Sequence, residues 1–168
     1  MRKIILLFIV FVIFISCGHD RKDTTSDKIE ITEVLDSFNT AAAKADYDNY
    51  FKYLTDDAVF IGTDAGEYWN KKDFMIWAKP YFDKGKAWNF NSVKRNIYFD
   101  QTGRTAWFDE LLNTQMKICR GSGVLTKEGN QWKIRQYVLS MTMPNAQMNE
   151  AIKLKSGIED SIILKLNK

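Results

Sequence analysis

The spacing of the apolar residues changes near Lys86, and this change limits the fold more than any other feature of the chain. Before Lys86, apolar side chains recur every three or four residues, which is the spacing of one face of an α-helix. After Lys86 they alternate with polar residues, the pattern of a half-buried β-strand. A chain that places helices first and antiparallel strands second is typical of the α+β class, in which helices pack on one face of a sheet.

Three helices are predicted in the first half. The longest starts near Asp27 and carries a single apolar stripe. Asp46, a typical capping residue, separates it from a second, short helix. The third helix covers 70–82, and we expect Pro80 to end it or bend it. A short strand at 57–63 lies between the second and third helices.

The second half predicts a long antiparallel meander. Its strands cover residues 88–99, 105–113, 117–126 and 131–143. Turn-forming residues stand between them, so consecutive strands are expected to form hairpins. The segment 146–167 places its apolar residues roughly on one face and predicts a possible docked amphipathic helix, which Gly157 weakens.

The N-terminus has the pattern of a targeting signal. Two basic residues precede an unbroken apolar run, Ile4 to Ile15. The run is shorter than the roughly 20 residues needed to cross a membrane, but it fits the apolar core of a signal peptide. Ser16 and Cys17 follow directly and resemble a bacterial lipobox, in which a small residue precedes an obligatory cysteine.

The lipobox resemblance implies cleavage before Cys17 and attachment of lipid to it. The alternative is an ordinary secretory signal with an incidental cysteine. We therefore expect a cell-envelope protein, anchored in a membrane through Cys17 and facing the periplasm or the cell surface. The expected divisions are a signal peptide with lipobox at 1–16, the lipidated cysteine and a polar tether at 17–27, a folded domain at 28–145 and a helical tail at 146–168.

Charge and residue counts exclude several functions. The formal charge is +3, and removal of Arg2 and Lys3 leaves 22 basic against 21 acidic residues, so no nucleic-acid partner is expected. With Cys17 lipidated, Cys119 has no cysteine to pair with. His19 is the only histidine and lies in the tether, which argues against a zinc site and against histidine-based catalysis. We expect no metal and no cofactor.

Five segments of the chain resemble the SnoaL-like branch of the nuclear-transport-factor-2-like (NTF2-like) superfamily. They are AAAKADYDNYFKYLTDDAVFIGTDAGEYW, IWAKPYFDKGKAW, AWFDELL, CRGSGVL and WKIRQYVLSMTMPN. The resemblance covers about residues 29–145. It implies a cone-shaped barrel in which about three helices pack on a curved antiparallel sheet around a hollow, often as a dimer across the sheet. It does not imply a reaction, because the superfamily contains isomerases, dehydratases, cyclases, epoxide hydrolases and non-catalytic binding modules.

Two adjacent carboxylates, Asp109 and Glu110, lie on the strand 105–113, where neighbouring side chains point to opposite faces. A hairpin loop centred on Gln115 would place Glu110 opposite Arg120, on the more apolar face. The sequence therefore predicts that Glu110 faces the hollow. A register shifted by one residue would give that position to Asp109 instead.

The role of this predicted pair stays open. Arg95 also falls on the Glu110 face and is a second possible partner. A cation beside a buried carboxylate keeps it ionised, which suits a structural or ligand-orienting pair better than a general base at neutral pH. Direct proton transfer by Glu110 with Arg120 is the alternative. Glu67, in the loop before the third helix, is a further candidate acid, with helix-dipole placement as the other interpretation.

The sequence favours binding over catalysis, because the domain has no histidine and its best-placed acid has an arginine as neighbour. The expected ligand is small and largely apolar. Candidate ligand-binding residues are Tyr50, Trp77, Phe108, Ser122 and Tyr137. The alternatives are a metal-independent acid/base enzyme (an isomerase, dehydratase or hydrolase) and a dimeric scaffold whose hollow is filled by its own side chains. We expect a homodimer through the outer sheet face, where Trp107 and Leu111 are large apolar residues.

Overall fold

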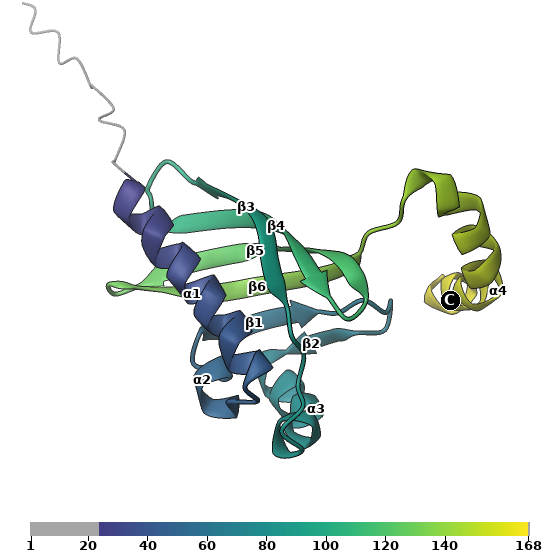
Figure 1. The fold of residues 1–168 in the computed structure, drawn as a ribbon, viewed down its shortest axis with the longest axis horizontal. Helices are drawn as coiled ribbons and strands as arrows, with labels where there is room; N and C mark the ends of the chain where they lie inside the picture. Colours follow the sequence, from purple (N-terminus) through teal and green to yellow (C-terminus); the bar gives the residue numbers. More distant parts are fainter. Residues whose placement is uncertain (1–23, 168) are drawn as a thin grey trace, which may run out of the picture.

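A long helix lies across a curved six-stranded sheet, and two shorter helices close one end of the molecule (Figure 1). The computed structural model describes residues 24–167. The predicted signal peptide and Cys17 lie outside this range. The elements are α1 (Thr25–Ala43), α2 (Tyr47–Phe51), β1 (Leu54–Ile61), β2 (Tyr68–Asn70), α3 (Lys71–Asp83), β3 (Asn91–Phe99), β4 (Thr105–Thr114), β5 (Lys117–Glu128), β6 (Gln131–Met141), the 3₁₀ turn η1 (Asn145–Gln147) and α4 (Met148–Leu166).

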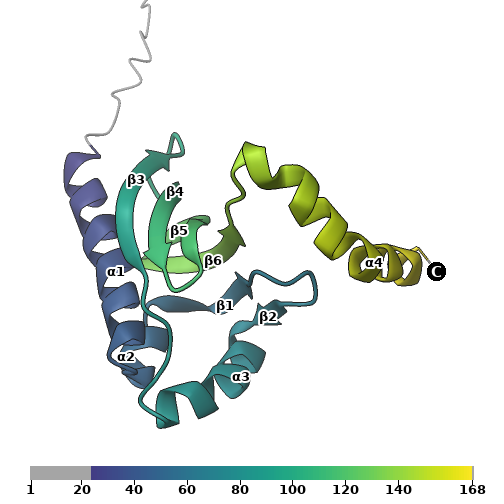
Figure 2. The same cartoon turned by 45° about the vertical axis from the view of Figure 1, so that its right-hand side comes forward.

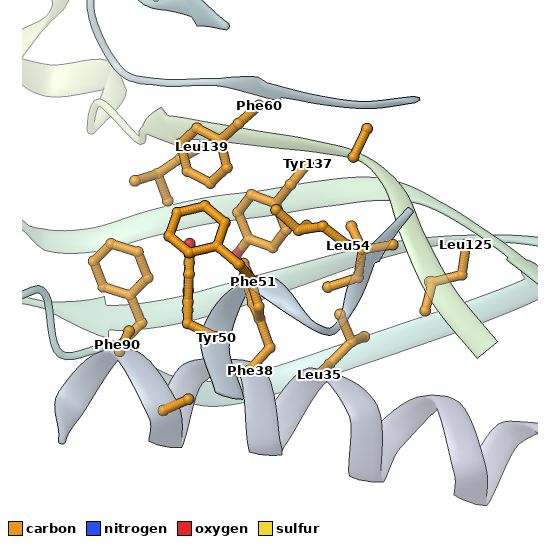
Figure 3. Close-up of a cluster of buried hydrophobic side chains, with 14 of the residues drawn as sticks. Leu35, Phe38, Tyr50, Phe51, Leu54, Phe60, Phe90, Leu125, Tyr137 and Leu139 are labelled. Carbon is orange, nitrogen blue, oxygen red and sulfur yellow. The ribbon is translucent and has the colours of Figure 1, made fainter. Parts of the chain in front are cut away.

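The predicted apolar stripe of α1 forms one wall of the core. Ile31, Leu35, Phe38 and Ala42 are separated by four, three and four residues, and each is at most 1% exposed. This spacing keeps the four side chains on one helix face, which packs against the sheet. Figure 3 shows Leu35 and Phe38 pointing from the helix into a cluster of aromatic and aliphatic side chains.

The two shorter helices begin at side-chain caps. The Asp46 side chain accepts a hydrogen bond from the Asn49 backbone N–H at the start of α2, as predicted. Asn70 does the same for α3. Pro80 does not end α3, which continues to Asp83. The interruption is tolerated because Pro80 is on an exposed face, where water can satisfy the carbonyl group that proline leaves without a donor.

The sheet has the strand order β2-β1-β6-β5-β4-β3, and β3 to β6 form the predicted antiparallel meander. The sheet is antiparallel as expected except at one place, where β1 and β6 pair in parallel. After β1 the chain forms β2, α3 and the first three strands of the meander. Strand β6 then pairs with the edge of β1 that β2 does not occupy, and it runs in the same direction as β1. The three-residue β2 was not predicted, because it is too short to show an alternating pattern.

Glycines in β5 allow the sheet to bend, as the sequence indicated. Between β5 and β6 the register shifts, so that Arg135 is an extra residue on β6. A Cβ atom on Gly123 would lie 2.1 Å from the Gln136 carbonyl oxygen, a distance that no other residue tolerates. Gly123 therefore permits the close approach of the two strands at the bend.

Helix α4 extends away from the cone, and both views show it separated from the sheet (Figures 1 and 2). None of its residues is buried, so the expectation of a docked helix is wrong, although the helix itself forms. Pro144 and the turn η1 direct the chain away from the end of β6. No helix within residues 24–167 is long and apolar enough to span a membrane.

Candidate functional site

Glu110 points into the cone, as predicted from its strand. It has no solvent exposure, whereas the Asp109 side chain is 35% exposed on the outer face of the sheet. Strand β4 alternates, and its buried positions include Ala106, Phe108 and Leu112 together with Glu110. A carboxylate in this position needs partners, because burial of an unpaired charge is costly.

The main partner of Glu110 is Arg95, not Arg120. Strands β3 and β4 place the two residues directly opposite each other. The Arg95 Nε donates to Glu110 Oε2 at 2.9 Å, and Nη2 lies 2.7 Å from the same oxygen with an angle that is poor for a hydrogen bond. The Arg95 side chain is only 8% exposed. The sequence therefore identified the correct face and the correct alternative cation.

The predicted Glu110–Arg120 pair is wrong by one residue of register. Thr114 pairs with Lys117, so the hairpin is centred between Gln115 and Met116 rather than on Gln115. Glu110 is then opposite Gly121, and Arg120 moves to the outer face. There Arg120 Nη1 lies 3.4 Å from Asp109 Oδ1.

Arg95 also links the sheet to helix α1. Its Nη1 lies 2.9 Å from Asp36 Oδ1 and donates to the Thr32 carbonyl oxygen at 3.3 Å. Asp36 is on the surface, with a side chain that is 59% exposed. The guanidinium therefore joins a surface carboxylate on α1 to the buried carboxylate on β4, and it holds the helix and the sheet at a fixed separation.

Tyr137 completes the surroundings of Glu110. Its hydroxyl donates to Glu110 Oε1 at 3.2 Å, so both carboxylate oxygens have a donor. Burial, and next the charge of Glu110, raise the pKa of Tyr137 well above its usual value of 10.0. Gly121 makes room for the contact, because a Cβ atom there would lie 2.5 Å from the tyrosine oxygen.

Tyr50 is the second buried tyrosine of this core, and Figure 3 shows it with Tyr137 in the space between α1 and the sheet. Its ring stacks on Phe38 with centroids 4.1 Å apart. No described residue makes a hydrogen bond of good geometry to its hydroxyl, although the nearby Trp88 indole acts to lower the pKa of Tyr50. Burial raises the pKa of Tyr50 well above 10.0. The hydroxyl therefore stays protonated and polar inside an apolar core.

A separate pocket, which we call the mouth pocket, lies where β1, β2, α3 and the β4–β5 turn meet. Its volume is about 130 Å³. Six aromatic side chains line it, namely Phe60, Trp69, Phe74, Trp77, Trp88 and Phe90. Glu67 and Gln115 are its larger polar groups, and Leu139 and Met116 complete the apolar wall. Wider hollows on the outside of the domain, of about 560 and 630 Å³, include none of the predicted site residues.

Glu67 lies at the edge of the mouth pocket in a tight loop. Its Oε2 accepts a hydrogen bond from the Asp64 backbone N–H at 3.1 Å. The carboxylate packs directly against Gly62, since a Cβ atom at that position would lie 2.2 Å from Oε2. Asp64 has the turn role expected of an aspartate beside glycine, since its Oδ1 accepts from the Gly66 N–H at 2.8 Å. The strand β2 separates Glu67 from α3, so helix-dipole placement does not explain its position.

The structure divides the predicted site residues among three places. Glu67 and Trp77 line the mouth pocket. Tyr50, Phe108, Glu110 and Tyr137 lie in the closed core, and each is at most 2% exposed. Arg120 and Ser122 follow the alternation of β5 onto the outer face, where Ser122 is opposite Asp109. The cone therefore does not gather these residues into one site.

Sequence reasoning missed one member of the Glu110 network and placed another second. Asp36 gave no signal, because a charged residue outside the apolar stripe of a helix reads as solvated surface. Arg95 was identified only as the second possible partner, because its place opposite Glu110 depends on the β3–β4 register, which pairs Phe99 with Ala106.

The fold and the closed core with an aromatic mouth define an NTF2-like cone. A family model described as "SnoaL-like domain" matches residues 31–144. The chain therefore belongs to the SnoaL-like domain family. No curated protein matches it.

Solved structures share this fold at low sequence identity. An NTF2-like protein of unknown function from Pseudomonas putida is 14% identical, with a TM-score of 0.62 over 72% of this chain and 90% of that one. A domain of unknown function with a cystatin-like fold from Nostoc punctiforme is 13% identical, with a TM-score of 0.62 over 86% of this chain and 99% of that one. A candidate dehydratase of the NTF2-like family from Streptomyces avermitilis is 13% identical, with a TM-score of 0.59 over 71% and 98%. These likenesses concern the fold alone.

Proposed function

We propose that this chain is a cell-envelope lipoprotein, anchored through Cys17, whose SnoaL-like domain binds a small, largely apolar ligand in the mouth pocket. The observation that carries the binding proposal is the aromatic lining of a pocket that reaches the surface, where the Trp77 side chain keeps 37% exposure. Ligand sites are typically apolar hollows with a few polar groups, and Glu67 and Gln115 supply those groups here.

The size of the pocket restricts what it can hold. Its volume of about 130 Å³ is below the roughly 300–1,000 Å³ of sites for drug-sized ligands. The pocket therefore suits a compact group of a few heavy atoms, and the remainder of any larger ligand would stay outside.

Acid/base catalysis by Glu110 has less support. A catalytic carboxylate must come within about 2.6–3.2 Å of the proton that it moves. Glu110 is fully buried, both of its oxygens already accept hydrogen bonds, and it does not line the mouth pocket. The geometry favours a structural role for the Glu110–Arg95 pair.

A homodimer through the outer sheet face is part of the proposal. Trp107 and Tyr98 stack on that face with centroids 5.9 Å apart, and they remain 45% and 47% exposed. Helix α4 does not cover them. The substitution Trp107→Glu is expected to turn a dimer into a monomer in light scattering, whereas Ile76→Glu, at an exposed position on α3, should leave the mass unchanged. A wild-type protein that is monomeric at micromolar concentration would refute the dimer.

The binding proposal is tested by tryptophan fluorescence with a panel of small apolar compounds, such as toluene, indole and hexanol. At least one should change the emission saturably, and Trp77→Ala should weaken its binding. Trp107→Ala is the matched control, because Trp107 is similarly exposed but lies on the outer face. Absence of saturable binding by the whole panel, or equal loss in both variants, would contradict the proposal.

A further inference from the structure

Within residues 24–167, the charge of the mouth pocket comes from a single residue. Glu67 is the only charged side chain among the described residues of its lining. None of the ion pairs found within residues 24–167 includes Glu67, and only its Oε2 accepts a hydrogen bond in this part of the chain. The second oxygen, Oε1, therefore has no donor from the described residues. A half-buried carboxylate beside an apolar surface usually has a cation near it, because the cation compensates the free-energy cost of removing water from the charge.

Three tryptophans line the pocket beside this carboxylate, and their rings pack on one another. Trp69 and Trp77 have centroids 4.7 Å apart, and Trp77 and Trp88 are 6.2 Å apart. The face of an aromatic ring is the negative part of its quadrupole, and tryptophan attracts cations most strongly. The lysines that lie over rings in residues 24–167 contact Tyr53, Tyr47 and Trp132, all outside the mouth pocket. Within that range, no lysine lies over the ring of a pocket tryptophan.

We propose that the mouth pocket selects a cation, namely an ammonium group carrying methyl substituents. This inference rests on the proposed function and specifies the ligand class of the same site. A methylated ammonium is compact enough for the small volume, and its methyl groups contact aromatic faces without needing hydrogen bonds. An unmethylated ammonium is strongly hydrated, and a wall of six aromatic rings with Glu67 and Gln115 as its larger polar groups replaces only part of the water that it would lose.

Charge separates this ligand from a neutral apolar group of the same shape. A neutral group would remove water from the Glu67 carboxylate without supplying a charge or a hydrogen bond to compensate. A cation would interact favourably with both the carboxylate and the rings. The pocket should therefore bind a cation more tightly than its uncharged isostere.

The test compares choline with 3,3-dimethyl-1-butanol, in which a carbon replaces the charged nitrogen. Affinities are measured by calorimetry and tryptophan fluorescence on the wild-type domain. We expect choline to bind roughly tenfold more tightly or better, a ratio set by the cation–π and carboxylate contacts. Glu67→Gln should remove most of that preference and leave the affinity for the alcohol nearly unchanged. The side-chain amide of this variant would keep an oxygen to accept the Asp64 N–H.

Asp64→Asn is the matched control, because Asp64 lies in the same loop but does not line the pocket. It should leave the choline preference unchanged. If Glu67→Gln does not fold, Trp77→Phe provides a second test, since it retains a ring with weaker attraction for cations and should lower choline affinity more than alcohol affinity.

Equal affinity for the two compounds would overturn the cation inference and leave the binding proposal intact. Failure of choline to bind, while an apolar compound of the panel binds, would overturn it in the same way. Failure of every compound would contradict the proposed function as well.

Discussion

The guanidinium of Arg95 lies against the carboxylate of Glu110 inside the sheet, with Nη2 2.7 Å from Oε2. Both side chains are almost completely buried, and the only exposed member of their network within residues 24–167 is Asp36 on α1. A buried pair of this kind is sensitive to the loss of either partner, because the other is left as an uncompensated charge. The pair therefore holds α1 on the sheet, which is a structural role.

Loss of the Glu110 charge should destabilise the fold. Glu110→Gln leaves the buried Arg95 without its main counter-charge, so the free energy of unfolding is expected to fall by about 3–5 kcal/mol. Asp109→Asn, at the neighbouring half-exposed position, should change it by no more than about 0.5 kcal/mol. Urea denaturation of the two variants measures both values. A large loss for Asp109→Asn with none for Glu110→Gln would reverse the assignment of the two faces.

The two buried tyrosines should respond differently to removal of the hydroxyl. Tyr137→Phe removes a hydrogen bond to a charged group and should cost about 1.5–3 kcal/mol. Tyr50→Phe removes a buried hydroxyl that has no hydrogen bond from the described residues, so the variant should be as stable as the wild type or more stable. Thermal and urea unfolding of the pair provide the comparison. A clear loss for Tyr50→Phe would mean that this hydroxyl has a partner, such as a buried water.

Stability should fall as the pH rises above about 10. Burial raises the folded-state pKa values of Tyr50 and Tyr137, so the unfolded chain releases these protons first and the folded state then binds more protons. The contribution of the two residues is fully present below pH 10.0, the usual tyrosine pKa, and is lost progressively above it.

Urea titrations at about pH 8 and about pH 11 measure this alkaline loss. The double variant Tyr50→Phe/Tyr137→Phe should lose less stability across the interval than the wild type. A double variant of two exposed tyrosines, Tyr68→Phe/Tyr81→Phe, should lose as much as the wild type. Equal losses in all three proteins would show that the buried hydroxyls do not control the alkaline transition.

Membrane attachment should depend on Cys17. Replacement by alanine removes the thiol that would carry the lipid, and the apolar run before it is too short to span a membrane. We expect Cys17→Ala to leave the membrane fraction, or to accumulate as the uncleaved precursor, while Cys119→Ala stays attached. The intact mass of the mature protein checks the same point, and an unmodified Cys17 would reject the lipoprotein assignment.

Much of the fold could be predicted because it follows from local patterns. The stripe of α1, the Asp46 cap and the alternation of β4 each depend on a few neighbouring residues. The inward position of Glu110 was predictable for the same reason, because it depends on the apolar residues that share its face of β4. The one-residue error in the β4–β5 register moved Arg120, and not Glu110, to the other face. The partner of Glu110 was harder to predict. Moving the centre of the β4–β5 hairpin by half a residue changes which β5 residue lies opposite Glu110.

The remaining features depend on contacts between distant segments. The parallel pairing of β1 with β6 and the separation of α4 from the domain have no local signature. The mouth pocket is also non-local, because Glu67, Trp77 and Trp88 are brought together by the return of the chain after α3. Aromatic residues could be listed from the sequence, but those in the pocket wall could not be separated from those of the core.

The claim that the mouth pocket is the ligand site is tested most directly by following the five tryptophan indole N–H signals in an NMR titration with choline and with 3,3-dimethyl-1-butanol. Trp69, Trp77 and Trp88 line the pocket, whereas Trp107 is on the outer face and Trp132 donates to Asp27. The account predicts saturable shifts of the three mouth signals, larger for choline, and unchanged signals for the other two. Shifts confined to Trp107 or Trp132, or no shift at all, would contradict it.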